Sequence, residues 1–162
     1  MLNNLAGLAW TERTIAMTSD GSPWRPLVHG LDIATAVTMV LAAPREQVHN
    51  EILNVGSNGG NHQVRDIAET VADVFHGCEL RFGESAGDDR SYRVSFDKIA
   101  HVLPGFACDW DATAGAKQLH AVFEAVELDR ATFTSPDHTR LARIEQLIRT
   151  GQLDADLYWT HP

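Results

Sequence analysis

Residues 24–32 decide the fold of this chain, and they read Trp24-Arg25-Pro26-Leu27-Val28-His29-Gly30-Leu31-Asp32. The part from Arg25 to His29 predicts a strand, and Asp32 is a good N-cap for the helix that should follow. That helix carries apolar residues at helical spacing and should end before Pro44. A strand that runs directly into a helix is typical of α/β proteins.

The same alternation of strands and helices extends in both directions from this stretch. Apolar periodicity and turn residues predict further strands over 14–18, 51–55 and 79–82, and helices over 2–10, 64–75, 96–102 and 112–126. A last helix should be capped by Ser135, with Pro136 at its first position and Gly151 after its end. We therefore expect an α/β fold of short strands alternating with helices, followed by a helical tail. No repeat or long linker divides residues 1–162, which predicts a single domain.

Composition places the chain among globular proteins and argues against two kinds of partner. Hydrophobic residues make up 44% of the 162 residues and charged residues 22%. The net charge of −9 argues against a nucleic-acid-binding surface, which needs a basic face. No apolar run approaches the roughly 18 residues of a membrane span, and the first residues lack the order of a signal peptide. The sequence therefore predicts a cytoplasmic protein without a membrane or nucleic-acid partner.

A glycine-rich segment, Gly56-Ser57-Asn58-Gly59-Gly60, follows a predicted strand and precedes a predicted helix, as dinucleotide-binding glycines do. The place of the third glycine of that pattern is occupied by His62. The helix also begins several residues late, so its N-terminal amides are poorly placed for a pyrophosphate. We interpret the segment as a strand-to-helix loop and assign no cofactor to it.

Metal and thiol chemistry have little support in the sequence. None of the eight histidines stands three or four residues from another histidine. The nearest group of possible ligands is a loop with His101, Cys108, Asp109 and Asp111. Cys78 and Cys108 lack the spacing of a CxxC pair, which favours two free thiols. No metal site is predicted.

Three segments, in this order, carry a resemblance to a known family. They are residues 24–32, then Ile52-Leu53-Asn54-Val55-Gly56, and then the stretch from Gly87-Asp88-Asp89-Arg90-Ser91-Tyr92 to Ile99. Together they resemble the C-terminal half of extended short-chain dehydrogenase/reductases that act on nucleotide sugars, the NAD-dependent epimerases and dehydratases. The resemblance implies the C-terminal part of a Rossmann-like fold, with the N-terminal dinucleotide-binding half absent from this chain.

The resemblance also implies which catalytic groups to look for. Enzymes of this family use a tyrosine with a lysine four residues later, which lowers the pKa of the tyrosine. The chain has only Tyr92 and Tyr158, and Phe96 and Pro162 stand four residues after them. We therefore assign no catalytic residue and do not expect hydride transfer by this chain alone. In the intact family the N-terminal half holds NAD or NADP, so this chain is expected to bind neither by itself.

What remains is the substrate side of the family's site, which implies a nucleotide-diphosphate sugar as ligand. By resemblance, the backbone of Ala16 and Thr18 would pack against the nucleotide base. Arg25 would contact the diphosphate, because a planar guanidinium can donate two parallel hydrogen bonds to it. An asparagine that the family carries near the start of this half would correspond to Asn4.

The segment with Gly87 and Asp88 would supply the remaining contacts. By resemblance, Asp88 would accept hydrogen bonds from the ribose hydroxyls, and Arg90 would lie near the phosphates. Relatives often carry a second phosphate-binding arginine three residues before that aspartate, where this chain has Ser85. The resemblance then implies that Arg90 or Arg93 takes over this contact.

Both arginines also have a plainer interpretation. Arg25 could be a surface arginine paired with Asp20 or Asp32. Arg90 could be an exposed charge beside its neighbouring aspartates, and such pairs contribute little. The sequence leaves both alternatives open.

Three functions follow, and we favour the first. The chain is the substrate-binding part of an NAD(P)-dependent nucleotide-sugar epimerase or dehydratase, inactive on its own, and shortened or paired with a separate N-terminal Rossmann half. Alternatively it is a non-catalytic module of the same origin that binds a partner protein or itself, since a missing half would leave apolar surface uncovered at Leu27 and Leu53. A small metal-dependent enzyme that uses the histidines ranks last.

Overall fold

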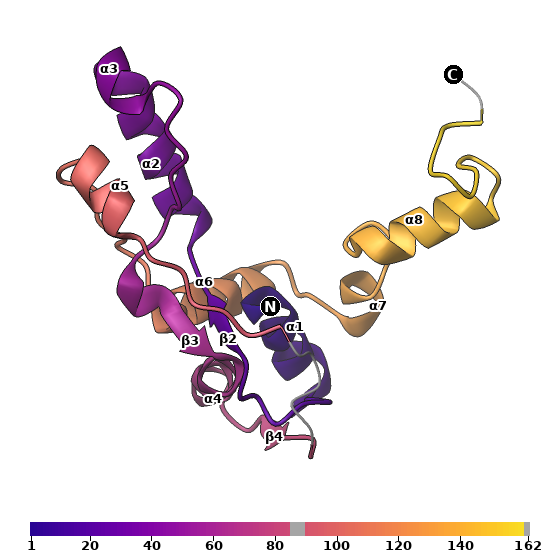
Figure 1. Ribbon diagram of the computed structural model, residues 1–162. Coiled ribbons are helices and arrows are strands. Elements are labelled where there is room, and N and C mark those ends of the chain that lie inside the picture. The colour runs from indigo at the N-terminus through magenta and orange to yellow at the C-terminus, as the bar shows by residue number, and fades with distance from the viewer. Residues whose placement is uncertain (85–89, 161–162) are drawn as a thin grey trace. The chain divides into compact units, whose positions relative to one another are not determined.

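The computed structural model describes residues 1–84 and 90–160 (Figure 1). The chain divides into two compact units, residues 1–121 and residues 122–162. In the first unit, strands and helices alternate as the sequence predicts, so the α/β class is confirmed. The second unit contains the predicted helical tail.

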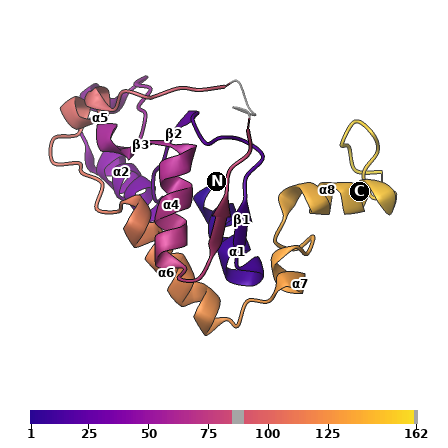
Figure 2. The same ribbon diagram turned by 90° about the horizontal axis from the view of Figure 1, so that it is seen from below.

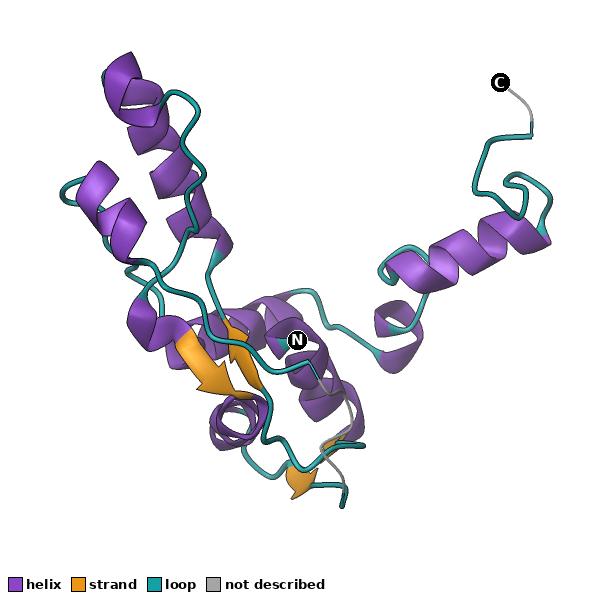
Figure 3. Cartoon of the chain, in the orientation of Figure 1, coloured by secondary structure: helices purple, strands orange, loops and turns teal. Residues whose placement is uncertain are grey.

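The first unit contains two small sheets, drawn in orange in Figure 3. Strand β1 (Thr14–Ala16) pairs in parallel with β4 (Glu79–Arg81), and β2 (Trp24–Pro26) pairs antiparallel with β3 (Asn61–Gln63). Arg25 stands opposite His62 in the second sheet. β3 was not predicted, because its residues are polar and become a strand only by pairing with β2.

The helices of this unit match the predicted spans closely, with one short addition, α3. They are α1 (Leu2–Glu12), α2 (Gly30–Ala42), α3 (Arg45–Val48), α4 (Val64–Val74), α5 (Asp97–Val102) and α6 (Ala112–Ala125), the last of which continues into the second unit. Asp111 caps α6, because its Oδ1 accepts a hydrogen bond from the Ala114 N–H at 2.7 Å. A single turn of 3-10 helix, η1 (Asn58–Gly60), leads into β3.

One hydrophobic core lies between α1, β1 and α4, which Figure 2 shows side by side. Ile67, Val71 and Phe75 follow one another at intervals of four residues along one face of α4, and all three are fully buried together with Ile15 of β1. Burying such a side chain contributes about 1.5–3 kcal/mol. The capping box between Gln63 and Asp66 fixes where α4 begins.

A second core lies against α2. Its centre is Ala36, Phe96, Ile99 and Leu103, and half-buried apolar residues, Leu53 among them, pack around it. The opposite side of α2 is exposed: Ile33 is 41%, Val37 53% and Leu41 81% accessible, and Ile52 nearby in sequence is 84% accessible. The sequence placed the uncovered apolar surface at Leu27 and Leu53 instead, but both are half-buried.

Two local predictions around this core were wrong. No strand forms over 51–55 among the described residues, although half-buried and exposed side chains alternate there as in a strand. The N-cap of α2 is His29, whose Nδ1 accepts a hydrogen bond from the Leu31 N–H at 3.1 Å. Asp32 lies in the first turn of the helix and is only 2% exposed, because its Oδ1 accepts a bond from the backbone N–H of Asp109 at 3.0 Å.

The second unit contains two helices, α7 (Arg130–Phe133) and α8 (Arg140–Arg149). The sequence predicted that α8 begins at Pro136. It begins four residues later, because the residues after Ser135 form a turn in which the Thr139 N–H donates to the Ser135 carbonyl at 3.0 Å. Leu147 and Leu153 are buried in this unit. None of the described helices combines the length and the apolar character that a membrane crossing requires.

Candidate functional site

The side chain of Arg25 reaches the backbone of Arg90, and both arginines are ones that the resemblance assigns to phosphate. The Arg25 side chain donates an Nη1–H hydrogen bond to the backbone carbonyl of Arg90, which is 65 residues further along the chain. The Arg25 guanidinium also lies over the ring of Tyr92, with 5.2 Å between its Cζ and the ring centroid. The third implied residue, Asp88, lies outside the described residues.

The segment that begins at Arg90 runs along the edge of β2 that β3 leaves open. The backbone N–H of Trp24 donates to Ser91 Oγ at 3.0 Å, and the Tyr92 N–H donates to the Trp24 carbonyl at 3.3 Å. Arg93 lies over the Trp24 ring at 5.0 Å. Two of the motifs quoted from the sequence are therefore joined at β2.

Asparagine side chains hold the continuation of this segment. Asn61 exchanges two hydrogen bonds with the backbone of Val94, at 2.8 and 3.0 Å, as a neighbouring strand would. Asn58 accepts from the Phe96 N–H at 2.9 Å and donates to Asp97 Oδ1 at 2.7 Å. Hydrogen bonds from Asn58 and Ser95 hold the pKa of Asp97 below its ordinary value.

The aspartates considered as partners of Arg25 both make other contacts. Asp20 accepts from the Ser22 N–H at 2.9 Å, and its backbone carbonyl accepts from the Arg65 guanidinium at 2.8 Å. Asp32 is buried against the backbone of Asp109. Arg25 donates to the backbone carbonyls of Trp24 and Arg90 and lies over the ring of Tyr92.

The other three implied residues lie elsewhere in the first unit. Ala16 ends β1, opposite Arg81 of β4, and its side chain is exposed. Thr18 is exposed, and its carbonyl lies so close to Gly83 that a Cβ there would stand 2.2 Å from it. Asn4 is exposed in the first turn of α1.

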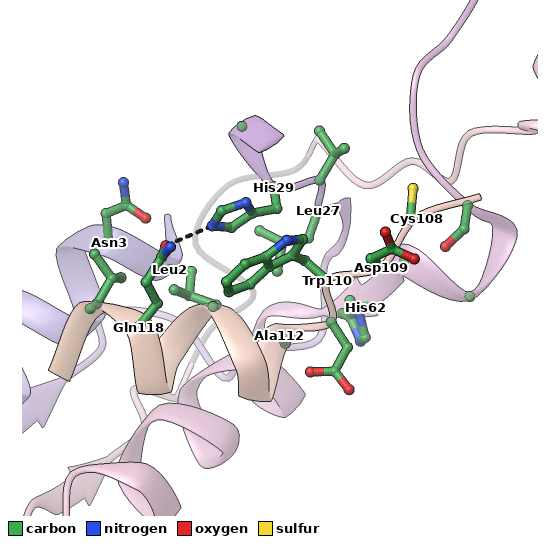
Figure 4. A pocket seen from close by; sticks show the side chains of 18 residues that line it. Leu2, Asn3, Leu27, His29, His62, Cys108, Asp109, Trp110, Ala112 and Gln118 are labelled. Atoms are coloured by element: carbon green, nitrogen blue, oxygen red, sulfur yellow. Dashed lines mark hydrogen bonds between the residues drawn. The ribbon is translucent and has the colours of Figure 1, made fainter. Parts of the chain in front are cut away.

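A pocket of about 560 Å³ opens in the first unit, and Figure 4 shows it from close by. Its walls are the start of α1, residues 27–30, residues 57–62, residues 108–112 and one side of α6. The rings of His29 and Trp110 are stacked in it, with centroids 4.1 Å apart and planes 11° apart. None of Asn4, Ala16, Thr18, Arg25 and Arg90 is among its lining residues.

The two partners of His29 indicate which tautomer the neutral ring adopts. Its Nδ1 accepts from the Leu31 N–H, so the proton of the neutral ring is on Nε2. Nε2 lies 2.8 Å from Gln118 Oε1 on α6 and donates to it. The sequence favoured a structural histidine here, and these contacts agree with that interpretation, although the ring also lines the pocket.

A buried carboxylate positions the loop that carries Trp110. Asp32 binds the backbone of Asp109, and Cys108 lies beside the same carboxylate. Burial raises the pKa of the Cys108 thiol, and the carboxylates of Asp32 and Asp109 raise it further. A thiol in these surroundings stays protonated at neutral pH and is a poor nucleophile or metal ligand. Within the described residues no group of three histidine, cysteine or acidic side chains could hold a metal ion.

The pocket and Arg25 lie on the same face of the β2–β3 sheet. Directly paired residues of antiparallel strands point to the same side, and so do residues two apart on one strand. His62, the partner of Arg25, and Leu27, two residues after Arg25, both line the pocket. Sequence analysis did not single out Trp110 or Gln118, because only the fold brings residues so far apart in sequence to His29.

Comparisons with known proteins agree with this fold. Residues 1–56 match the family model described as NAD dependent epimerase/dehydratase family. The fold is similar to ADP-L-glycero-D-manno-heptose-6-epimerase of Helicobacter pylori, with a TM-score of 0.64 and 15% identity over 77% of this chain and 38% of that one. It is also similar to RMD from Pseudomonas aeruginosa, solved with NADPH, with a TM-score of 0.54 and 16% identity over 76% of this chain and 40% of that one.

The chain thus spans about two fifths of the length of these solved structures. No curated protein matches its sequence. These structures confirm the Rossmann-like α/β fold that the resemblance implies, and the match of residues 1–56 to the epimerase/dehydratase model agrees with the resemblance.

Proposed function

We propose that this chain, whose first 56 residues match the NAD-dependent epimerase/dehydratase family, is the substrate-binding part of a nucleotide-sugar epimerase or dehydratase. Its ligand is a nucleotide-diphosphate sugar. One observation carries the proposal: Arg25, in the first family motif, binds the backbone of Arg90 in the motif implied to bind nucleotide. Two stretches 65 residues apart thereby meet in one surface. In this proposal residues 1–162 form a single substrate-binding domain.

The charge of this surface suits a diphosphate. The side chains of Arg25, Arg90 and Arg93 belong to β2 and the segment along its edge, although the chain as a whole has a net charge of −9. Guanidinium groups bind phosphate oxygens through paired, charge-assisted hydrogen bonds. In this proposal Arg25 and Arg90 hold the diphosphate and Asp88 accepts from the ribose. Ala16 and Thr18 contribute on the side of the base, and Asn4 is the counterpart of the family's asparagine in the substrate site.

The cofactor belongs to another part of the enzyme. RMD from Pseudomonas aeruginosa was solved with NADPH, and the matching family is NAD-dependent. Packing accounts for two glycines of this loop: a Cβ at Gly60 would stand 2.8 Å from the Leu27 carbonyl, and one at Gly56 would stand 2.5 Å from the Phe96 ring. In the proposed function the chain holds neither NAD nor NADP by itself, and it transfers no hydride alone.

A second polypeptide surface completes the proposal. The exposed stripe of Ile33, Val37 and Leu41 on α2 is apolar surface of the kind that proteins cover. This chain covers 38% and 40% of the two matched structures, so each is more than twice as long as the part that aligns with it. We therefore propose that a Rossmann half covers this stripe, in the cytoplasm as the sequence predicts. The same stripe favours the second candidate function, a non-catalytic module that associates with itself or with another protein.

Calorimetric titration of the chain tests the ligand. UDP-, GDP-, ADP- and dTDP-sugars are titrated in turn, and at least one is expected to bind. Replacing Arg25 by Ala should weaken that binding tenfold or more, because the guanidinium is both a phosphate ligand and the contact that holds Arg90. Arg45→Ala is the matched control, since Arg45 is exposed on α3 and contacts His49. Unchanged affinity in the Arg25 variant, or binding of none of the nucleotide sugars, would refute the proposal.

A further inference from the structure

The pocket between α1, α6 and residues 57–62 takes no part in the proposed contacts to the diphosphate, and its chemistry differs from that of the arginine surface. Among its described lining residues are two aspartates, Asp109 and Asp111, and neither lysine nor arginine. An anionic phosphate group would be repelled there, because nearby carboxylates disfavour a further negative charge. The pocket is therefore unsuited to a phosphate group.

One wall of the pocket is aromatic. The half-buried Trp110 is stacked on His29, and the buried Asp32 fixes the loop that carries it. Large, rigid aromatic rings offer an apolar surface at little cost in conformational entropy. The C–H face of a sugar ring is a flat apolar surface of matching size.

The other walls offer hydrogen-bonding groups of both kinds. Gln118 uses its Oε1 to accept from His29, and no described residue accepts from its Nε2. The amide of Asn3 at the start of α1 and the ring of His62 also line the space, as do the carboxylates of Asp109 and Asp111. Sugar hydroxyl groups donate and accept at once, so they can satisfy amides and carboxylates together.

The pocket lies within reach of the proposed diphosphate site. Arg25 and the pocket residues Leu27 and His62 share one face of the β2–β3 sheet. Two residues along a strand span roughly 7 Å, which is within the length of one nucleotide sugar. The volume of about 560 Å³ is also in the range of about 300–1,000 Å³ that small-molecule sites occupy.

We propose that this pocket holds the sugar ring of the nucleotide sugar, a neutral polyhydroxylated ring, with Trp110 as its platform and Gln118 Nε2 as a donor to it. This inference rests on the proposed function, because it takes the diphosphate to be at Arg25. It assigns two binding residues, Trp110 and Gln118, that the sequence does not reveal.

The test compares each nucleoside diphosphate with its sugar conjugate. UDP and UDP-glucose, GDP and GDP-mannose, ADP and ADP-glucose, and dTDP and dTDP-glucose are titrated into the full chain by calorimetry. For the base that binds, the conjugate should bind at least tenfold more tightly than the diphosphate. In Trp110→Ala that advantage should be lost while the affinity for the diphosphate stays within twofold, and Gln118→Ala should lose three- to fivefold for the conjugate only.

Controls separate binding from folding. Trp110→Phe keeps an aromatic platform and should retain most of the advantage, and Trp159→Ala removes an exposed tryptophan of the second unit and should change neither affinity. Conjugate binding that Trp110→Ala leaves unchanged, or a conjugate and a diphosphate weakened equally, would overturn the pocket assignment and leave the proposed function standing. Failure of all eight compounds to bind would overturn the proposed function and this inference with it.

Discussion

Helices α2 and α4 of the first unit differ in how completely their apolar residues are covered. α4 buries Ile67, Val71 and Phe75 fully, and its polar residues face outward. α2 buries Ala36 on one side and leaves Ile33, Val37 and Leu41 exposed on the other. Exposed apolar residues in a row along a helix are typical of a surface that another polypeptide covers. The comparison teaches that the apolar face of α4 is completely covered within this chain, whereas α2 has an apolar face that a further polypeptide could cover.

The largest expected effect on stability is in the buried core beside α4. Phe75→Ala should lower the free energy of unfolding by about 3–5 kcal/mol, because it removes a fully buried ring from between α1 and α4. Denaturant unfolding measures the loss. Val37→Ala on α2 is the control and should change stability by no more than about 0.5 kcal/mol. Equal losses in the two variants would contradict the contrast between the helices.

The buried side of α2 depends on the segment that carries Phe96, and Asn61 holds that segment. Asn61→Ala should cost about 1–2 kcal/mol, since the half-buried N–H and carbonyl of Val94 both lose their partner. Asn61→Asp keeps the acceptor for the Val94 N–H and should cost less than the alanine variant. Chemical unfolding of both variants checks the order, and a reversed order would show that the two bonds do not hold the segment.

The exposed side of α2 should govern association. We expect the isolated chain to form dimers or larger species, and Leu41→Glu to weaken this association at least tenfold, because a charge would be placed in the apolar stripe. Thr38→Glu adds the same charge at another exposed position of α2 and serves as control. Sedimentation velocity measures both. A wild-type chain that stays monomeric at high concentration would remove the argument for a covered stripe.

The smallest effect is electrostatic and concerns the helix that packs on α2. The pKa of Asp97 is below its ordinary value in the folded chain, so its carboxylate contributes stability at pH values above about 4. That contribution should disappear as the pH falls through the lowered pKa. Asp97→Asn should therefore be slightly less stable than wild type at pH 6, and the difference should shrink below pH 4. A difference that does not depend on pH would show that the hydrogen bonds act without the charge.

The sequence predicted the features that depend on neighbours along the chain. α1, α4 and α6 lie within two residues of their expected bounds, since apolar spacing and the cap at Asp111 are local signals. β3 was missed because Asn61, His62 and Gln63 become a strand only opposite β2. The expected strand at 51–55 has strand-like residues, but pairing requires a second strand that the described chain does not bring there.

The candidate site also contains features that could be expected from the sequence and features that depend on contacts between distant residues. The meeting of Arg25 with Arg90 was anticipated through the family resemblance, which carries information about a fold that spacing alone lacks. Asp32 looked like a helix cap, but a backbone N–H 77 residues away binds its carboxylate. The pairing of His29 with Trp110 and Gln118 joins residues from separate parts of the chain, so no local pattern announces it.

The contact from Arg25 ends on a main-chain carbonyl and not on a side chain. Every amino acid offers the same oxygen at position 90, so mutation there leaves the junction in place. Position 25 has no such freedom, because the group that reaches across is the side chain itself. The side chain at position 90 can therefore change its charge without breaking the contact. Position 25 must remain an arginine to hold the two segments together.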